Sequence, residues 1–155
     1  MQTEQNAVSA IAPRLDYRGL FGWPVSWHNG GLMLVTGSGV GAVTVPRALS
    51  DQVLESLARQ GCAGPALSLP TKQGVVVILL VETDTLASGE ESLPTGVRVL
   101  NAGASIPLPE HRRADELAHW IVPPDTSQRW LPSLTAVLTC IRSSCRVRLE
   151  TSAHR

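Results

Sequence analysis

The stretch Gly31–Pro46, GLMLVTGSGVGAVTVP, predicts the centre of the fold. Leu32–Val35 is a continuous apolar run, as expected of a buried strand, and Ala42–Val45 resumes that character after a glycine-rich segment. The glycines between the two runs indicate a turn, because glycine adopts the positive φ angles that tight turns need. Pro46 has no N–H to donate, so it ends the second strand or places that strand at a sheet edge.

Further elements are expected along the chain. The apolar run Val75–Val81 predicts a strand that is buried on both faces and central in its sheet. Apolar periodicity predicts helices over Asp51–Gln60, with Ser50 as its N-cap, and over Ser133–Arg142. Together these elements predict an α/β (α+β) fold, a central mixed sheet with flanking helices. The sheet is expected to contain Leu32–Val35, Ala42–Val45, Val75–Val81 and Val97–Leu100.

The length of 155 residues predicts one domain. We expect a flexible N-terminus over 1–14, a single domain over 15–145 and a basic tail over 146–155. The N-terminus lacks the pattern of a signal peptide, and no apolar run approaches the roughly 20 residues of a membrane helix. The sequence therefore predicts a cytoplasmic protein that does not insert into membranes.

The charge balance bears on partners. Lys and Arg number 13, as do Asp and Glu, so the formal net charge is zero, and only 17% of residues are charged. Such a surface has no global field to attract nucleic acid, and little self-repulsion to keep copies apart. A protein partner or homo-oligomer is therefore expected.

The sequence shows no metal or cofactor motif. The three cysteines, Cys62, Cys140 and Cys145, include no CxxC, so a zinc site is not expected. We expect instead that these cysteines are reduced thiols without a chemical role. The segment Gly37–Gly41 lacks the Gly-Lys-Ser/Thr of a phosphate-binding loop and precedes an apolar strand, so it is interpreted as a turn. No histidine stands in a recognised nucleophile motif. We expect no catalytic residue, no metal and no cofactor.

Taken in order, the motifs resemble the N-terminal domain of bifunctional DNA primase/polymerases, in the small form common in actinobacteria. The resemblance covers about residues 15–124. It rests on these segments in order: Gly22–Val25, Thr36–Gly41, Ala42–Pro46, Gly64-Pro65, Pro70–Gly74, Val75–Val81, Gly96–Leu100 and Trp120–Pro124. It implies the archaeo-eukaryotic primase-like fold.

The departures from that family fall on its chemistry. The family's two metal-binding aspartates correspond to Thr44 and Pro46, and its third acidic position corresponds to Arg98. Its nucleotide-binding histidine falls within Val75–Val77. Two-metal phosphoryl transfer needs carboxylates that hold two ions about 4 Å apart. The resemblance therefore implies the fold and argues against the activity, which indicates a pseudoenzyme with a degenerate active site.

Three functional hypotheses remain open. The favoured one is a non-catalytic binding or regulatory module that acts through protein–protein contacts. The second is a nucleic-acid-binding module that retains the old template groove, and the third is an enzyme of unrecognised type. Trp23 and Trp27 would either stack on bases or pack in a core or partner interface. The candidate binding residues are Trp23, Trp27, Lys72 and Arg98.

Overall fold

The computed structural model describes residues 16–28, 30–83, 93–110, 117–128 and 130–153, with side chains as far as residue 145. The flexible N-terminus expected over 1–14 lies outside these ranges. In chain order the elements are α2 (Tyr17–Phe21), β1 (Val25–His28), β2 (Gly31–Val35), β3 (Val40–Pro46), α3 (Arg47–Arg59), β4 (Ala66–Thr71), β5 (Gly74–Glu82), β6 (Arg98–Val99), β7 (Ser105–Pro107), β8 (His119–Val122) and α4 (Leu134–Ala153).

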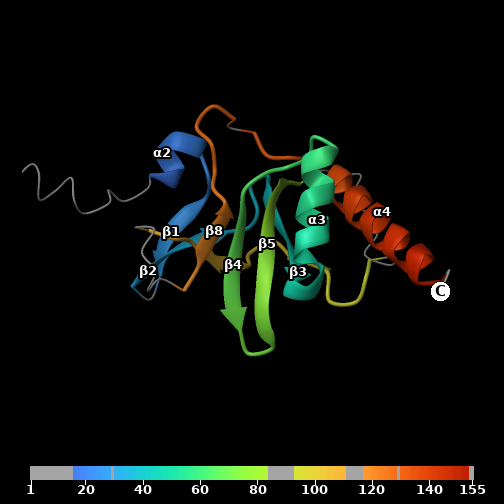
Figure 1. Ribbon diagram of the computed structural model, residues 1–155. Helices are drawn as coiled ribbons and strands as arrows, with labels where there is room; N and C mark the ends of the chain where they lie inside the picture. The colour runs from blue at the N-terminus through green and yellow to red at the C-terminus, as the bar shows by residue number, and fades with distance from the viewer. Residues whose placement is uncertain (1–15, 29, 84–92, 111–116, 129, 154–155) are drawn as a thin grey trace, which may run out of the picture.

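The strands form two sheets, and the α+β class is confirmed. The larger sheet has the order β6-β3-β5-β4-β8, and the smaller has the order β1-β2-β7. Within the described residues, every pairing between strands of these two sheets is antiparallel. The prediction of a mixed sheet was therefore wrong. Leu32–Val35 lies in the smaller sheet, not beside Ala42–Val45. In Figure 1, α3 and α4 lie together on one side of the larger sheet, away from α2, β1 and β2.

The pairing of β3 with β5 forms the middle of the larger sheet. It runs from Val40 opposite Glu82 to Pro46 opposite Val76, and β5 is central as predicted. Alternate side chains enter two separate cores, because successive residues of a strand point to opposite faces. Val43, Val45 and Leu79 belong to the core that includes residues of α3 and α4. The other core contains Ala42, Ile78, Leu80, Leu34, Ile106, Tyr17 and Trp23.

The glycine-rich segment is a tight turn, as predicted. The Gly37 N–H donates to the Val40 oxygen at 2.8 Å, and the Val40 N–H donates to the Gly37 oxygen at 3.0 Å. The two residues between them, Ser38 and Gly39, have φ angles of 53° and 90°. Positive φ at both central positions is the geometry of a type I′ turn. This turn carries the chain from the smaller sheet into the larger one.

The two longer helices differ from their expected bounds. Helix α3 begins at Arg47 because Pro46 takes the N-cap position, so the expected cap Ser50 lies inside the helix. The Ser50 hydroxyl instead donates to the Arg47 carbonyl oxygen at 2.9 Å. Helix α4 begins at Leu134, one residue after the expected start, and Ser133 Oγ accepts the Ala136 N–H at 3.1 Å. It continues to Ala153, so the backbone of the expected tail is helical to that residue.

One strand is shorter than expected. The strand expected over Val97–Leu100 is reduced to Arg98–Val99. Within the described ranges, each helix is either too short or too polar to cross a lipid bilayer.

Thr36 holds the end of β2 to the loop that precedes β7. Its side chain is 4% exposed. Its hydroxyl donates to the Asn101 oxygen at 2.7 Å and accepts the Ala104 N–H at 2.9 Å. Its own N–H donates to the Ala104 oxygen at 2.9 Å. One hydroxyl therefore satisfies two polar groups of a loop that lies far away in the sequence.

Replacing Thr36 with valine should lower the free energy of unfolding by about 2 kcal/mol, because the Asn101 oxygen and the Ala104 N–H lose their partner. Urea unfolding followed by circular dichroism measures this change. The control, Thr36→Ser, keeps the hydroxyl and should stay within about 1 kcal/mol of wild type. Equal stability of the valine variant and wild type would show that the hydroxyl does not hold this loop.

Candidate functional site

Thr44, Pro46 and Arg98, the three positions at which the resemblance led us to expect lost acids, lie together on one face of the larger sheet. Thr44 pairs directly with Arg98, and Pro46 follows two residues along β3. The Thr44 hydroxyl donates weakly to the Arg98 carbonyl oxygen, at 3.5 Å. The Pro46 ring lies against Gly96, where an added Cβ would be 2.6 Å from the proline Cγ. The register brings the three positions together, but they offer a hydroxyl, a hydrocarbon ring and a guanidinium.

No cluster of three or more His, Cys, Asp or Glu side chains is suited to hold a metal ion in the described part of the chain. Mg²⁺ is bound by carboxylates, carbonyls and water in near-octahedral geometry. Thr44, Pro46 and Arg98 have no carboxylate, so these three side chains do not offer the ligands that Mg²⁺ prefers.

The four candidate binding residues do not form one site. Trp23 is 3% exposed, and its ring stacks on Tyr17 at 5.5 Å and on Phe21 at 5.0 Å between ring centroids. Trp27 is 52% exposed and lies on β1 of the smaller sheet. Lys72 is in the exposed turn between β4 and β5, whereas Arg98 is on the edge strand β6. A base cannot stack on Trp23 without displacing its aromatic neighbours.

The aromatic neighbours of Trp23 explain why this tryptophan is buried. Trp120 donates its Nε1 hydrogen to the Tyr17 hydroxyl at 3.0 Å, and that hydroxyl donates to the Pro109 carbonyl oxygen. The rings of Trp23 and Trp120 lie 6.2 Å apart, tilted by 51°. This cluster joins α2, β8 and the segment before β1. Of the two interpretations of Trp23, base stacking or packing in a core, the structure therefore supports packing in a core.

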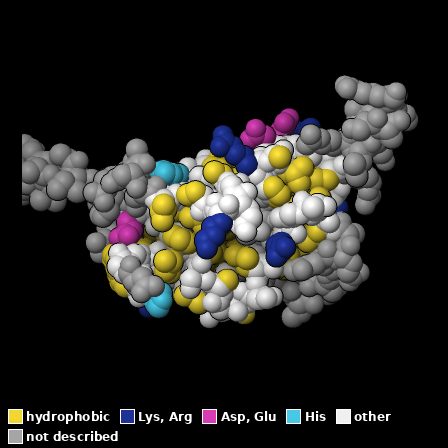
Figure 2. All heavy atoms as spheres, turned by 90° about the horizontal axis from the view of Figure 1, so that it is seen from below, with side chains coloured by type: hydrophobic (Ala, Val, Ile, Leu, Met, Phe, Trp, Pro, Cys, Tyr) yellow, Lys and Arg dark blue, Asp and Glu magenta, His cyan; other side chains and the backbone are white. Residues whose placement is uncertain are grey.

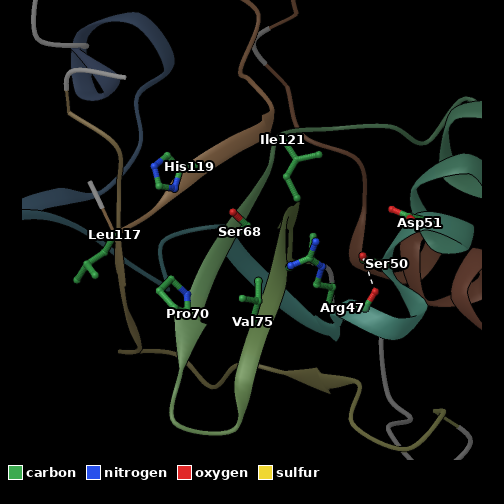
Figure 3. Close-up of a pocket in the computed structure, with 10 residues that line it drawn as sticks. Arg47, Ser50, Asp51, Ser68, Pro70, Val75, Leu117, His119 and Ile121 are labelled. Carbon is green, nitrogen blue, oxygen red and sulfur yellow. Dashed lines mark hydrogen bonds between the residues drawn. The ribbon is translucent and has the colours of Figure 1, made fainter. Parts of the chain in front are cut away.

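A groove that the sequence analysis did not identify lies beside the N-terminal end of α3. It has a volume of about 500 Å³. Its walls come from α3, from β4 and β5, and from the segment around β8, as Figure 3 shows. The residues that line it are Arg47, Ser50, Asp51, Ser68, Pro70, Val75, Val77, Leu117, His119 and Ile121.

The floor of the groove is apolar and partly open to solvent. Val75 and Val77 belong to β5, and Pro70 to β4. Ile121 and Leu117 are 44% and 68% exposed, which is high for large aliphatic side chains. An apolar hollow of this size is within the range of about 300–1,000 Å³ that binding pockets occupy. The floor therefore offers apolar surface that an occupant would remove from water.

Arg47 supplies a positive charge at the edge of this floor. It is exposed, and Figure 3 shows its side chain directed from α3 towards the strands. Among the described residues no ion pair neutralises its guanidinium. Asp51, one turn further along α3, is also exposed, while His119 lies on the opposite side of the groove in Figure 3. The groove thus combines an apolar floor with a cation beside it.

The surrounding surface has the same character. Figure 2 looks onto the end of the molecule that carries the β4–β5 turn, and it shows apolar side chains interspersed with Lys and Arg. The Asp and Glu side chains visible in this view lie at its margins. The net charge of zero is a sum over the whole chain, so it does not reveal this local excess of Lys and Arg. The segments that line the groove are far apart in the sequence, so no local motif marks it.

Compared with protein-family models, with curated proteins and with solved structures, the chain gave no match in any of the three. The groove, the register of the larger sheet and the sequence motifs are therefore the observations from which its function is inferred.

Proposed function

We propose that the chain is a cytoplasmic, non-catalytic primase/polymerase-like domain that binds a protein partner through the groove beside Arg47. The glycine and strand motifs follow the order of that family, which supports the fold assignment. Thr44, Pro46 and Arg98 stand where the family has acids, which argues against phosphoryl transfer. The observation that carries the proposal is the Arg47 guanidinium, without an ion-pair partner in the described chain, beside an exposed apolar floor.

The polar groups of the groove favour binding over catalysis. The Ser50 hydroxyl donates to the Arg47 carbonyl oxygen, so its proton is already engaged. Asp51 and His119 come from opposite walls, with the strands between them in Figure 3. Nucleophilic catalysis needs a nucleophile, a base and an orienting group within hydrogen-bond reach of one another. Ser50, Asp51 and His119 are not arranged in that way.

The proposed occupant is a protein segment that presents apolar side chains together with an Asp or Glu carboxylate. The apolar side chains would cover Val75 and Ile121, and burial of such surface contributes about 25 cal/mol per Å². The carboxylate would meet Arg47, whose planar guanidinium forms two parallel hydrogen bonds with this group. The N-terminal end of α3 adds a positive partial charge on the same side of the groove. These features complement an acidic, apolar segment.

A display library of random peptides, selected on the whole protein, tests this proposal. Wild type should enrich peptides that combine large apolar residues with Asp or Glu. Arg47→Glu should weaken those peptides by about tenfold or more, the equivalent of about 1.4 kcal/mol, and should enrich Lys or Arg in a new selection. Affinities of the enriched peptides are measured by fluorescence anisotropy.

The matched control is Arg98→Glu, which makes the same charge change on β6, outside the groove. It should leave the selected peptides and their affinities unchanged. Enrichment without acidic residues, or equal weakening by both variants, would contradict the groove as the binding site. Tight binding of single-stranded DNA that Arg47→Glu abolishes would favour the nucleic-acid alternative. A dimer that dissociates only in Arg47→Glu would identify a second copy as the occupant.

The loss of the metal site gives a separate prediction. Calorimetric titration with Mg²⁺ or Mn²⁺ should show no saturable heat, because Thr44, Pro46 and Arg98 supply no carboxylate. The control is the double variant Thr44→Asp with Arg98→Asp, which puts two carboxylates at directly paired positions and should gain weak Mn²⁺ binding. Saturable metal binding by wild type, lost on changing another Asp or Glu, would show that an acidic site lies elsewhere.

A further inference from the structure

Two cysteines that are far apart in the sequence converge on one glutamine. Cys62 follows the end of α3, and Cys140 lies within α4. The Cys62 thiol donates to the Gln60 carbonyl oxygen at 3.6 Å, and the Cys140 thiol donates to the Gln60 side-chain oxygen at 3.3 Å. The Gln60 amide nitrogen donates to the Ser56 hydroxyl at 3.1 Å, which fixes the side chain against α3. Both sulfur atoms therefore lie against the same residue.

The two thiols differ in their access to solvent. Cys62 is partly exposed, whereas Cys140 is 2% exposed within the core shared by α3 and α4. Burial, together with the neighbouring Cys62 thiol, raises the pKa of Cys140 to about 11. Cys140 therefore stays protonated at neutral pH, and a protonated thiol reacts slowly with oxidants. Cys62 is the member of the pair that a dissolved oxidant reaches first.

Cys145 is separated from this pair. It is buried near α3 on another part of α4, where its sulfur accepts a long hydrogen bond from the Gln52 amide at 3.8 Å. None of the three cysteines is in a disulfide in this structure. Of the three cysteines, Cys62 and Cys140 thus both contact Gln60, whereas Cys145 contacts Gln52.

We infer that Cys62 and Cys140 form a site of reversible thiol oxidation, in which a hydroperoxide oxidises Cys62 and Cys140 then closes a disulfide. This inference is independent of the proposed function. The Cys62 thiolate attacks the hydroperoxide, the O–O bond breaks, and Cys62 becomes a sulfenic acid while an alcohol or water leaves. The Cys140 thiol then gives its proton to the sulfenic hydroxyl as its sulfur attacks the Cys62 sulfur, the S–O bond breaks, and water leaves. Two thiols lose two electrons, and the hydroperoxide gains them.

The disulfide would join the end of α3 to α4 across a long loop of the chain. Cross-linking a long loop restricts the unfolded state, so oxidation should stabilise the protein against heat. The Gln60 side chain would lose the Cys140 hydrogen bond and keep the one to Ser56.

Mass spectrometry of the full-length protein after treatment with tert-butyl hydroperoxide tests the inference. Trypsin cleaves after Arg59, Lys72 and Arg142, so Cys62, Cys140 and Cys145 fall in different peptides. We expect a cross-link between the Cys62 and Cys140 peptides, the loss of two of the three thiols, and recovery of both with dithiothreitol. A higher Tm in the oxidised protein should accompany the cross-link.

Variants separate the roles of the two thiols. Cys145→Ser should still form the cross-link, which makes it the matched control. Cys140→Ser should leave a sulfenic acid on Cys62 that dimedone traps. A cross-link that involves Cys145, or oxidation of wild type without any cross-link, would overturn the inference; both are read in wild type, so the test does not depend on a variant that folds poorly.

Discussion

The antiparallel pairing of β3 with β5 is the interaction on which the rest of the structure depends. Both strands carry apolar side chains on both faces, so each face of the pair must be covered to remove it from water. Helices α3 and α4 supply one cover. The smaller sheet and the aromatic side chains around Trp23 supply the other. The two-core architecture follows from this requirement.

The helical cover also shapes the surface. Helix α3 contacts β3 and β5, and α4 packs on α3 and β5. The groove is lined by the start of α3 and by β4, β5 and the segment around β8, and β4 and β8 lie on the far side of β5 from β3 in the larger sheet. Arg47 is the first residue of α3, and Cys62 follows its end. At a rise of 1.5 Å per residue, this helix of 13 residues is roughly 20 Å long. The groove at its start and the thiol pair at its end are separated by about this length.

The face that carries Thr44 and Arg98 shows that the backbone arrangement of a site and the chemistry of its side chains are set separately. Register alone brings these two positions opposite each other and keeps Pro46 on the same face. Metal binding depends in addition on which atoms the side chains present, and here these are a hydroxyl, a guanidinium and a ring. Backbone register therefore decides which positions face each other, whereas the side chains at those positions decide whether a metal ion can bind.

The sequence by itself determined the local features: the glycine turn after β2, the start of α4 directly after Ser133 and the central place of Val75–Val81. These depend on backbone φ preference, capping and uninterrupted apolar character, which neighbouring residues decide. Only the tertiary structure decided which strands share a sheet. It also buried Trp23 while leaving Trp27 exposed, and brought Cys62 to Cys140. Such pairings depend on the faces that distant segments cover, and no local pattern records that choice.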